Sequence, residues 1–83
     1  MQTHNMSPAH RKFDAALQQA ARYRINPTYS VFRVSPCGDY TLMLTTHSRG
    51  AAYEAYRDTC LGNQYRQGIG AEVRCDGMRV DLS

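Results

Sequence analysis

The feature that most constrains the fold is a pair of apolar alternations on either side of Asp76-Gly77, near the end of this 83-residue chain. An Asp-Gly pair between two alternating segments is a strong signal for a two-residue hairpin turn. Pairing Cys75 with Met78 places Val73 opposite Val80, so the apolar side chains of this hairpin share one face. The other face is charged and consists of Glu72, Arg74, Arg79 and Asp81.

A second hairpin is predicted over residues 29–46, where β-branched and aromatic residues flank Pro36-Cys37-Gly38. A three-residue loop that ends in Gly is a common hairpin connection. It pairs Val34 with Tyr40 and Phe32 with Leu42. The expected core face consists of Phe32, Val34, Tyr40, Leu42 and Leu44. The expected outward face consists of Tyr29, Val31, Arg33, Thr41, Met43 and Thr45.

Each hairpin is preceded by a segment with helical periodicity. Ser7-Pro8 is typical of a helix start, and Asn26-Pro27 is expected to stop this first helix. Ser48 is expected to cap a second helix that runs roughly from residue 49 to residue 61, with a loop over residues 62–70. The predicted apolar stripes are Ala9, Phe13, Ala16, Leu17, Ala20 and Tyr23 in the first helix, and Ala52, Ala55, Tyr56, Thr59 and Cys60 in the second.

The order of the elements defines the expected fold class. Helix, hairpin, helix and hairpin give an αββαββ chain, and each hairpin has one apolar face that needs cover. We therefore expect an α+β fold, a two-layer sandwich in which two helices cover one face of a four-stranded antiparallel sheet. Residues 7–83 are expected to form this single domain, after a disordered N-terminal tail over residues 1–6.

Charge is distributed unevenly along the chain, whose net charge is +3. The first 34 residues contain five basic residues and one acidic residue, and Arg11 and Arg22 lie on the polar face of the first predicted helix. This basic region favours an acidic partner or phosphates, although a solvated helix face gives the same pattern. Neither a membrane-spanning run nor a secretory apolar region is found, so the expected location is cytoplasmic.

The sequence carries few signals of catalysis or of metal binding. Its three cysteines form no Cys-x-x-Cys pair, and its histidines are not spaced with them as zinc ligands are. Gly68-Ile69-Gly70 precedes a strand and lacks the third glycine of a dinucleotide loop. A chain of this size also has little volume for a substrate cavity. We therefore expect a protein that is not an enzyme and that has neither a metal nor a cofactor.

Residues 28–83 resemble, in architecture, the small single-domain α+β proteins that phages encode against host defences. The segments that carry this resemblance are the hairpin ending in DYTLMLTTHS, the helix SRGAAYEAYRDTC and the hairpin AEVRCDGMRVDL. Anti-CRISPR proteins are the best-known group of this kind. The resemblance assigns no residue a role. It implies stoichiometric binding to a host nucleoprotein defence complex such as CRISPR-Cas, in the host cytoplasm, which blocks the access of that complex to nucleic acid.

These observations predict a protein-binding module, most simply a stoichiometric inhibitor that contacts a large protein or nucleoprotein complex. Arginine and tyrosine are enriched at recognition surfaces, which makes them the candidate contacts. The predicted partner-binding residues are Arg11, Arg22, Tyr29, Arg33, Arg74 and Arg79. One alternative is direct nucleic-acid binding through the first helix and the open sheet face. Another is a homodimer that closes this face.

Overall fold

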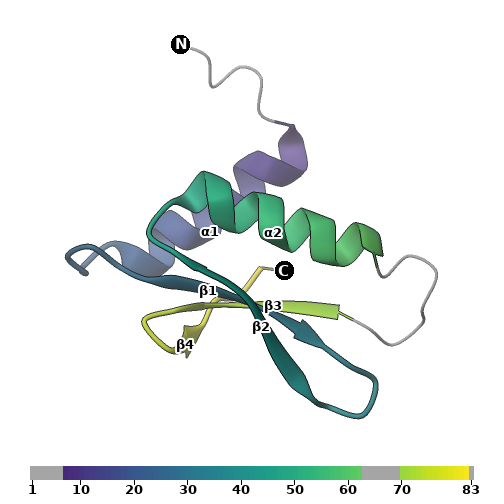
Figure 1. The fold of residues 1–83 in the computed structure, drawn as a ribbon. Coiled ribbons are helices and arrows are strands. Elements are labelled where there is room, and N and C mark those ends of the chain that lie inside the picture. Colours follow the sequence, from purple (N-terminus) through teal and green to yellow (C-terminus); the bar gives the residue numbers. More distant parts are fainter. Residues whose placement is uncertain (1–6, 63–69, 83) are drawn as a thin grey trace.

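Two helices and four strands alternate along the chain in the predicted order. The structure is a computed structural model and describes residues 7–62 and 70–82. Its elements are α1 (Pro8–Ala21), β1 (Tyr29–Val34), β2 (Tyr40–Thr46), α2 (Arg49–Gly62), β3 (Gly70–Cys75) and β4 (Met78–Arg79). The strands form one antiparallel sheet in the order β2-β1-β3-β4, and both helices cover the same face of it (Figure 1). The α+β fold is thus confirmed. The predicted tail and most of the predicted loop after α2 lie outside the described residues.

Helix α1 begins as predicted and ends earlier than predicted. The hydroxyl of Ser7 accepts a hydrogen bond from the His10 amide at 3.1 Å. The helix ends at Ala21, and a tighter hydrogen bond from the Arg24 amide to the Ala21 carbonyl then turns the chain away. Tyr23 therefore lies beyond the helix and is 85% exposed, so its predicted place in the apolar stripe is wrong.

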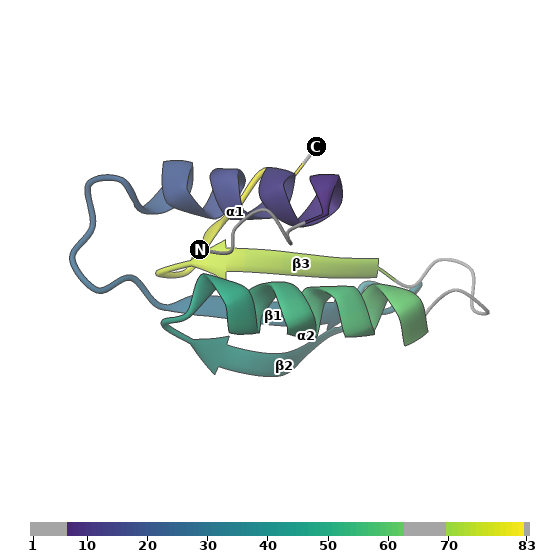
Figure 2. The ribbon, with the colours of Figure 1, turned by 90° about the horizontal axis from the view of Figure 1, so that it is seen from above.

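Helix α2 packs closely on the sheet because its buried side is small. The amide of Ala51 donates to the Ser48 hydroxyl at 3.2 Å, as the predicted cap requires. Ala52 is fully buried, as expected, whereas Cys60 is exposed. Tyr53, which is not part of the predicted apolar stripe, lies against Phe13 of α1 with ring centroids 5.2 Å apart. The two helices thus pack through aromatic rings as well as through small residues, and α2 lies above β1 (Figure 2).

A partly buried ion pair joins α1 to the start of α2. The side chain of Asp14, 13% exposed, accepts hydrogen bonds from Arg49 Nε at 2.7 Å and from Gln18 Nε2 at 2.6 Å. Burial by itself raises the pKa of the Asp14 carboxyl, but the bonds from Arg49 and Gln18 outweigh it and hold this pKa below 3.8. The carboxylate form of Asp14 is therefore the form that the folded protein stabilises.

The β3–β4 hairpin has the register and the faces that its sequence predicts. Asp76 and Gly77 have φ values of 50° and 86°, which place both residues in the left-handed region that a type I′ turn requires. The Val80 amide donates to the Val73 carbonyl at 2.8 Å, so the two valines lie opposite each other, and both are buried. The regular strand β4 ends at Arg79, whereas its partner β3 continues to Gly70.

The β1–β2 hairpin has the predicted register next to its loop, but its faces are reversed. Val34 pairs with Tyr40 and Phe32 with Leu42, as expected. However, Tyr29 and Val31 are 2% and 0% exposed and belong to the core, whereas Leu42 is 55% exposed. The predicted core face of this hairpin is therefore wrong for Phe32, Val34, Tyr40 and Leu42, whereas Leu44 lies on the helix-covered face as predicted.

Pairing with β3 explains the reversal. Strand β1 lies between β2 and β3, and Val31 is opposite Val73 while Tyr29 is opposite Cys75. Residues that lie opposite each other in a sheet point to the same face, so the buried side chains of β3 draw Tyr29 and Val31 under the helices. Phe32 then points to the open face with Glu72, its partner in β3.

A bulge in β2 shifts the rest of its register. Val31 pairs with Leu44 and Phe32 with Leu42, which leaves Met43 as an extra residue between them. Beyond this point Ser30 lies opposite Thr45, where an unbroken ladder from the loop places Leu44. The bulge therefore moves Leu44 to the helix-covered face and leaves Leu42 on the open face.

Candidate functional site

The face of the sheet that points away from the helices carries exposed apolar side chains. It includes Phe32 and Val34 from β1 and Tyr40 and Leu42 from β2, because their strand partners define this face. Tyr40 is 50% exposed and Leu42 is 55% exposed, and the neighbouring Met43 is 48% exposed. An apolar surface of this kind, bordered by charges, is typical of an interaction site.

An arginine lies over two aromatic rings at the centre of this face. The guanidinium carbon of Arg74 is 4.7 Å from the ring centroid of Phe32 and 5.1 Å from that of Tyr40. The two rings meet edge to face, with their centroids 6.2 Å apart. Both distances are within the roughly 6 Å over which a cation is attracted to the face of an aromatic ring. Three strands, β1, β2 and β3, thus contribute one side chain each to a single stacked arrangement.

Glu72 neutralises part of the positive charge of the arginines beside these rings. Glu72 Oε2 accepts from Arg74 Nε at 2.6 Å, and Glu72 Oε1 accepts from the Tyr40 hydroxyl at 3.4 Å. Arg79, which lies directly opposite Arg74 in the ladder, is 3.9 Å from Glu72 Oε1. The hydrogen bond that Arg74 donates to Glu72 is the main reason that the pKa of Arg74 is raised. We call Phe32, Tyr40, Glu72, Arg74 and Arg79 the aromatic–arginine cluster; its formal charge is +1.

The three charged side chains of the cluster differ in their exposure to solvent. The side chain of Glu72 is 13% exposed, that of Arg74 is 34% exposed, and that of Arg79 is 79% exposed. The carboxylate is thus covered by its partners, while the arginines reach the solvent. The charge that this face offers to a partner is therefore positive, and it stands beside the apolar side chains of Tyr40 and Leu42.

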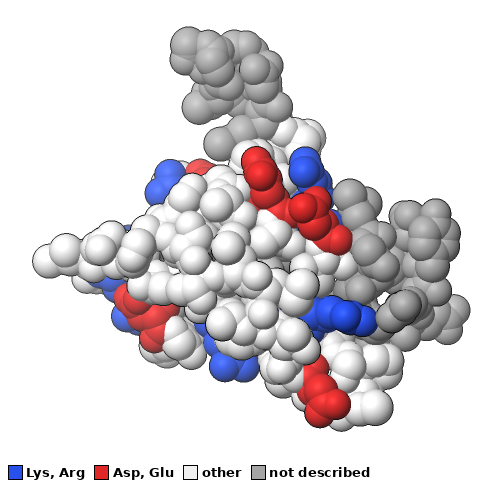
Figure 3. Space-filling model, in the orientation of Figure 1, with Lys and Arg blue, Asp and Glu red and all other residues white. Residues whose placement is uncertain are grey.

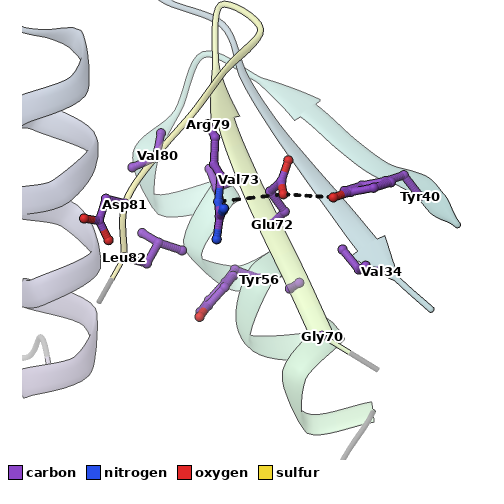
Figure 4. A pocket seen from close by; sticks show the side chains of 11 residues that line it. Val34, Tyr40, Tyr56, Gly70, Glu72, Val73, Arg79, Val80, Asp81 and Leu82 are labelled. Carbon is purple, nitrogen blue, oxygen red and sulfur yellow. Dashed lines mark hydrogen bonds and ion pairs between the residues drawn. The ribbon is translucent and has the colours of Figure 1, made fainter. Parts of the chain in front are cut away.

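A groove of about 420 Å³ extends from the cluster around the edge of β3. Figure 4 shows Tyr40, Glu72 and Arg79 joined by interactions on one side of β3, and Tyr56 of α2 on the other side. The groove exists because β4 has two residues and β3 has six, so the chain leaves the sheet at Val80. A partner on the open face therefore also has access to this groove, which is lined by residues of the sheet and by Tyr56 of the helix layer.

A smaller apolar hollow of about 280 Å³ lies between the two helices. Its floor includes the rings of Phe13, Tyr53 and Tyr56, and Lys12 and Arg57 lie at its border. Arg57 is 3.7 Å from Asp58, so one of the two cations already has an acidic neighbour. This hollow is in the helix layer, and it shares Tyr56 and Leu82 with the lining of the groove at β3.

The structure separates the predicted contact residues into three groups. Arg74 and Arg79 lie together on the open face, as predicted. Arg11 is exposed on α1 and Arg22 follows the end of α1, where its Nη2 donates to the hydroxyl of Tyr23 at 2.9 Å. Because α1 covers the other face of the sheet, these two arginines and the cluster belong to different sides of the molecule (Figure 1).

The predicted positions of Tyr29 and Arg33 on the open face are wrong. Tyr29 is 2% exposed and lies in the core, where burial raises the pKa of its phenol. Arg33 lies opposite Ala71 on the helix-covered side and is partly exposed at the end of the sheet. The residues that sequence reasoning missed are Phe32 and Tyr40. Their signal was the register between β1 and β3, which a reading of each hairpin by itself does not contain.

Other chemical groups are dispersed among the described residues. Within this part of the chain, histidine, cysteine and acidic side chains form no group of three that is able to hold a metal ion. Cys37 and Cys60 are exposed and Cys75 is buried, and burial raises the pKa of the thiols of Cys60 and Cys75. None of the described helices has the length and apolar character needed to cross a membrane.

Comparison with known proteins identified no relative. No family model matches the sequence, and no curated protein or solved structure matches it significantly. The function proposed for the open face therefore depends on its own chemistry. That chemistry is an arginine over two rings, a covered carboxylate and exposed aliphatic side chains on an uncovered sheet.

Proposed function

We propose that this chain is a protein-binding module that acts by binding rather than by catalysis, and that the open face of its sheet is the contact surface. The observation that carries the proposal is the aromatic–arginine cluster next to Leu42 and Met43, which are about half exposed. Tyrosine, arginine and methionine are enriched in the cores of protein interfaces, where rigid rings and forked donors gain contact area at a low entropic cost.

The partner that fits this surface has an apolar patch bordered by acidic side chains. Glu72 is covered, so Arg74 and Arg79 are the charges that meet a partner, and a carboxylate is the group that pairs best with a guanidinium. The form of binding that we propose is stoichiometric inhibition of a large protein or nucleoprotein complex, including the defence complexes implied by the resemblance to anti-CRISPR proteins. A cytoplasmic location belongs to the same proposal.

The test compares three tagged proteins as bait in a nuclease-treated lysate of the cells in which the protein acts. They are the native sequence, Arg79→Glu and Arg11→Glu. Both arginines are exposed and both variants change the charge by the same amount, but Arg79 belongs to the cluster whereas Arg11 lies on α1. We expect one protein to be recovered in a fixed ratio to the native bait and to Arg11→Glu, and to be lost with Arg79→Glu. Equal recovery with both variants contradicts the proposal.

Direct nucleic-acid binding is a second candidate that one observation favours. Phe32 and Tyr40 lie on neighbouring strands of the open face beside two arginines, and single-stranded RNA commonly stacks on aromatic side chains of such a sheet. Two features favour a protein partner instead. The Arg74 guanidinium already lies over both rings. On the side of the molecule in Figure 3, blue and red side chains are interspersed instead of forming one broad basic area.

Salt dependence separates these two candidates. Contacts to phosphate release counterions, so the logarithm of the binding constant falls by about 0.7 to 0.9 per contact for each tenfold rise in salt concentration. We expect weak binding to a fluorescent single-stranded RNA, and no selective loss of that binding in Arg79→Glu compared with Arg11→Glu. Tight RNA binding that Arg79→Glu abolishes and Arg11→Glu preserves supports the nucleic-acid candidate.

A further inference from the structure

The edge strand β2 lacks most of the features by which monomeric proteins protect their outer strands in the part that lies on the loop side of its bulge. Strand β2 is the first strand in the sheet order, and Figure 2 shows it at the margin, beside α2. Its seven residues, YTLMLTT, include no charge and no proline. Tyr40, Leu42 and Met43 are each about half exposed along it. Charged residues, proline, bulges and very short strands are the usual protection of an edge, and of these β2 has the bulge at Met43. The opposite edge, β4, has two residues and is protected by its shortness.

The backbone groups of Tyr40 and Leu42 point outward from this edge. The Ser35 amide donates to the Asp39 carbonyl at 2.9 Å, so these two residues form a hydrogen-bonded pair at the start of the β1–β2 ladder. Bonded and non-bonded pairs alternate along an antiparallel ladder. Thr41, opposite Arg33, is therefore bonded to β1, and the residues on either side of Thr41 direct their N–H and C=O groups away from β1.

We propose that a second copy of this chain docks antiparallel on β2, with the two-fold axis at Thr41. In this register Tyr40 of one copy pairs with Leu42 of the other copy, and the reverse pair forms by symmetry. Both residues direct their backbone groups outward and both side chains lie on the open face, so backbone and side chains are satisfied together. The pairing forms roughly four backbone hydrogen bonds, two for each bonded pair.

The bulge in β2 selects this register over its neighbour. An axis at Leu42 pairs Tyr40 with Leu44 of the other copy, and these side chains lie on opposite faces because Met43 is inserted between Leu42 and Leu44. The axis at Thr41 keeps the paired segment on the loop side of the bulge. It joins the two sheets into one of eight strands, in which Tyr40 and Leu42 lose solvent exposure and the two open faces become continuous. A segment this short implies a weak, concentration-dependent dimer.

A cysteine cross-link tests the register. The two Thr41 residues form a non-bonded pair, whose Cα atoms lie about 4.5 Å apart. This distance is within the range of roughly 4.4–6.8 Å that a disulfide spans. We therefore expect Thr41→Cys, in a chain whose exposed Cys37 and Cys60 are replaced by serine, to form a cross-linked dimer on mild oxidation. Thr45→Cys is the control, because Thr45 is exposed on the same strand but lies outside the paired segment. Equal cross-linking of the two variants overturns the proposal.

Sedimentation velocity of the purified chain tests the dimer without any substituted cysteine. The native sequence is expected to shift from 9.4 kDa towards twice that mass as its concentration rises. Leu42→Lys places like charges across the axis and is expected to remain at the monomer mass, whereas Thr45→Lys behaves as the native sequence does. Circular dichroism verifies that both variants fold. A native chain that stays at 9.4 kDa at every concentration overturns the proposal. These experiments need no other protein, so their outcome is independent of the function proposed above.

Discussion

The reversed faces of the β1–β2 hairpin make a quantitative prediction about two substitutions, Val31→Ala and Leu42→Ala. Val31 is 0% exposed, whereas Leu42 is 55% exposed. Val31→Ala removes two carbon atoms from the core, which costs about 1.6 kcal/mol at roughly 0.8 kcal/mol per methylene. The cavity that remains adds on the order of 1 kcal/mol. We therefore expect Val31→Ala to lower the free energy of unfolding by about 2.5 kcal/mol.

The same reasoning gives a smaller effect for Leu42→Ala. This substitution removes three carbon atoms, but more than half of the side chain is already in water and no closed cavity forms. We expect a loss of about 1 kcal/mol. In urea, where a small domain has a slope near 1 kcal/mol per molar, the midpoints should fall by about 2.5 M for Val31→Ala and about 1 M for Leu42→Ala.

Urea titrations followed by circular dichroism measure both midpoints, and the unfolding slopes should be equal in the two variants. A cost for Leu42→Ala that equals or exceeds that for Val31→Ala would refute the argument. That result is expected if Leu42 lies in the core and Val31 faces the solvent, as the sequence of the β1–β2 hairpin alone predicts.

Three further predictions concern the turn, the cap and the helix-to-helix ion pair. Gly77→Ala should lower the free energy of unfolding by about 1–2 kcal/mol, because Gly77 has a φ of 86° that alanine adopts only with strain. Thermal denaturation measures this loss. The control is Gly50→Ala, within α2, which should not destabilise the protein. Ser48→Ala should cost about 1 kcal/mol through loss of the hydrogen bond to the Ala51 amide, whereas Ser48→Asp should retain most of the stability. The native protein should lose stability as the pH falls below 3.8, because the pKa of Asp14 is lower in the folded state than in the unfolded state. The contribution of Asp14 to the free energy of unfolding is fully present above the pKa of the unfolded state, and it disappears as the carboxylate is protonated in the folded state. Unfolding measured across this pH range should show a smaller change in Asp14→Asn, and an identical pH dependence in the two proteins would contradict this assignment.

Local patterns predicted the elements whose structure depends on near neighbours in the chain. Asp76-Gly77 determines the second hairpin, because a turn with two left-handed residues fixes both the pairing and the shared face of Val73 and Val80. Ser7 and Ser48 mark the beginnings of the two helices for a similarly local reason. Each hydroxyl accepts a hydrogen bond from the backbone amide three residues later in the chain.

The faces of the first hairpin depend on a contact that is distant in sequence. Both faces of residues 29–46 contain apolar side chains, so alternation within this hairpin does not choose between them. The choice is made where Val31 meets Val73 on β3, 42 positions later in the chain. The same contact brings Arg74 over the rings of Phe32 and Tyr40, so the centre of the candidate site is a consequence of strand order. The sequence predicted Arg74 and Arg79 as contacts and could not supply the rings around them.

The most direct test of the central claim measures which side chains of the sheet face water. A soluble paramagnetic agent broadens the NMR signals of exposed methyl groups and leaves buried ones sharp. The account predicts strong broadening for Leu42 and Met43, and sharp signals for Val31 and Val73. Sharp signals for Leu42 together with broadened signals for Val31 would contradict it, because the aromatic–arginine cluster would then not lie on an open face.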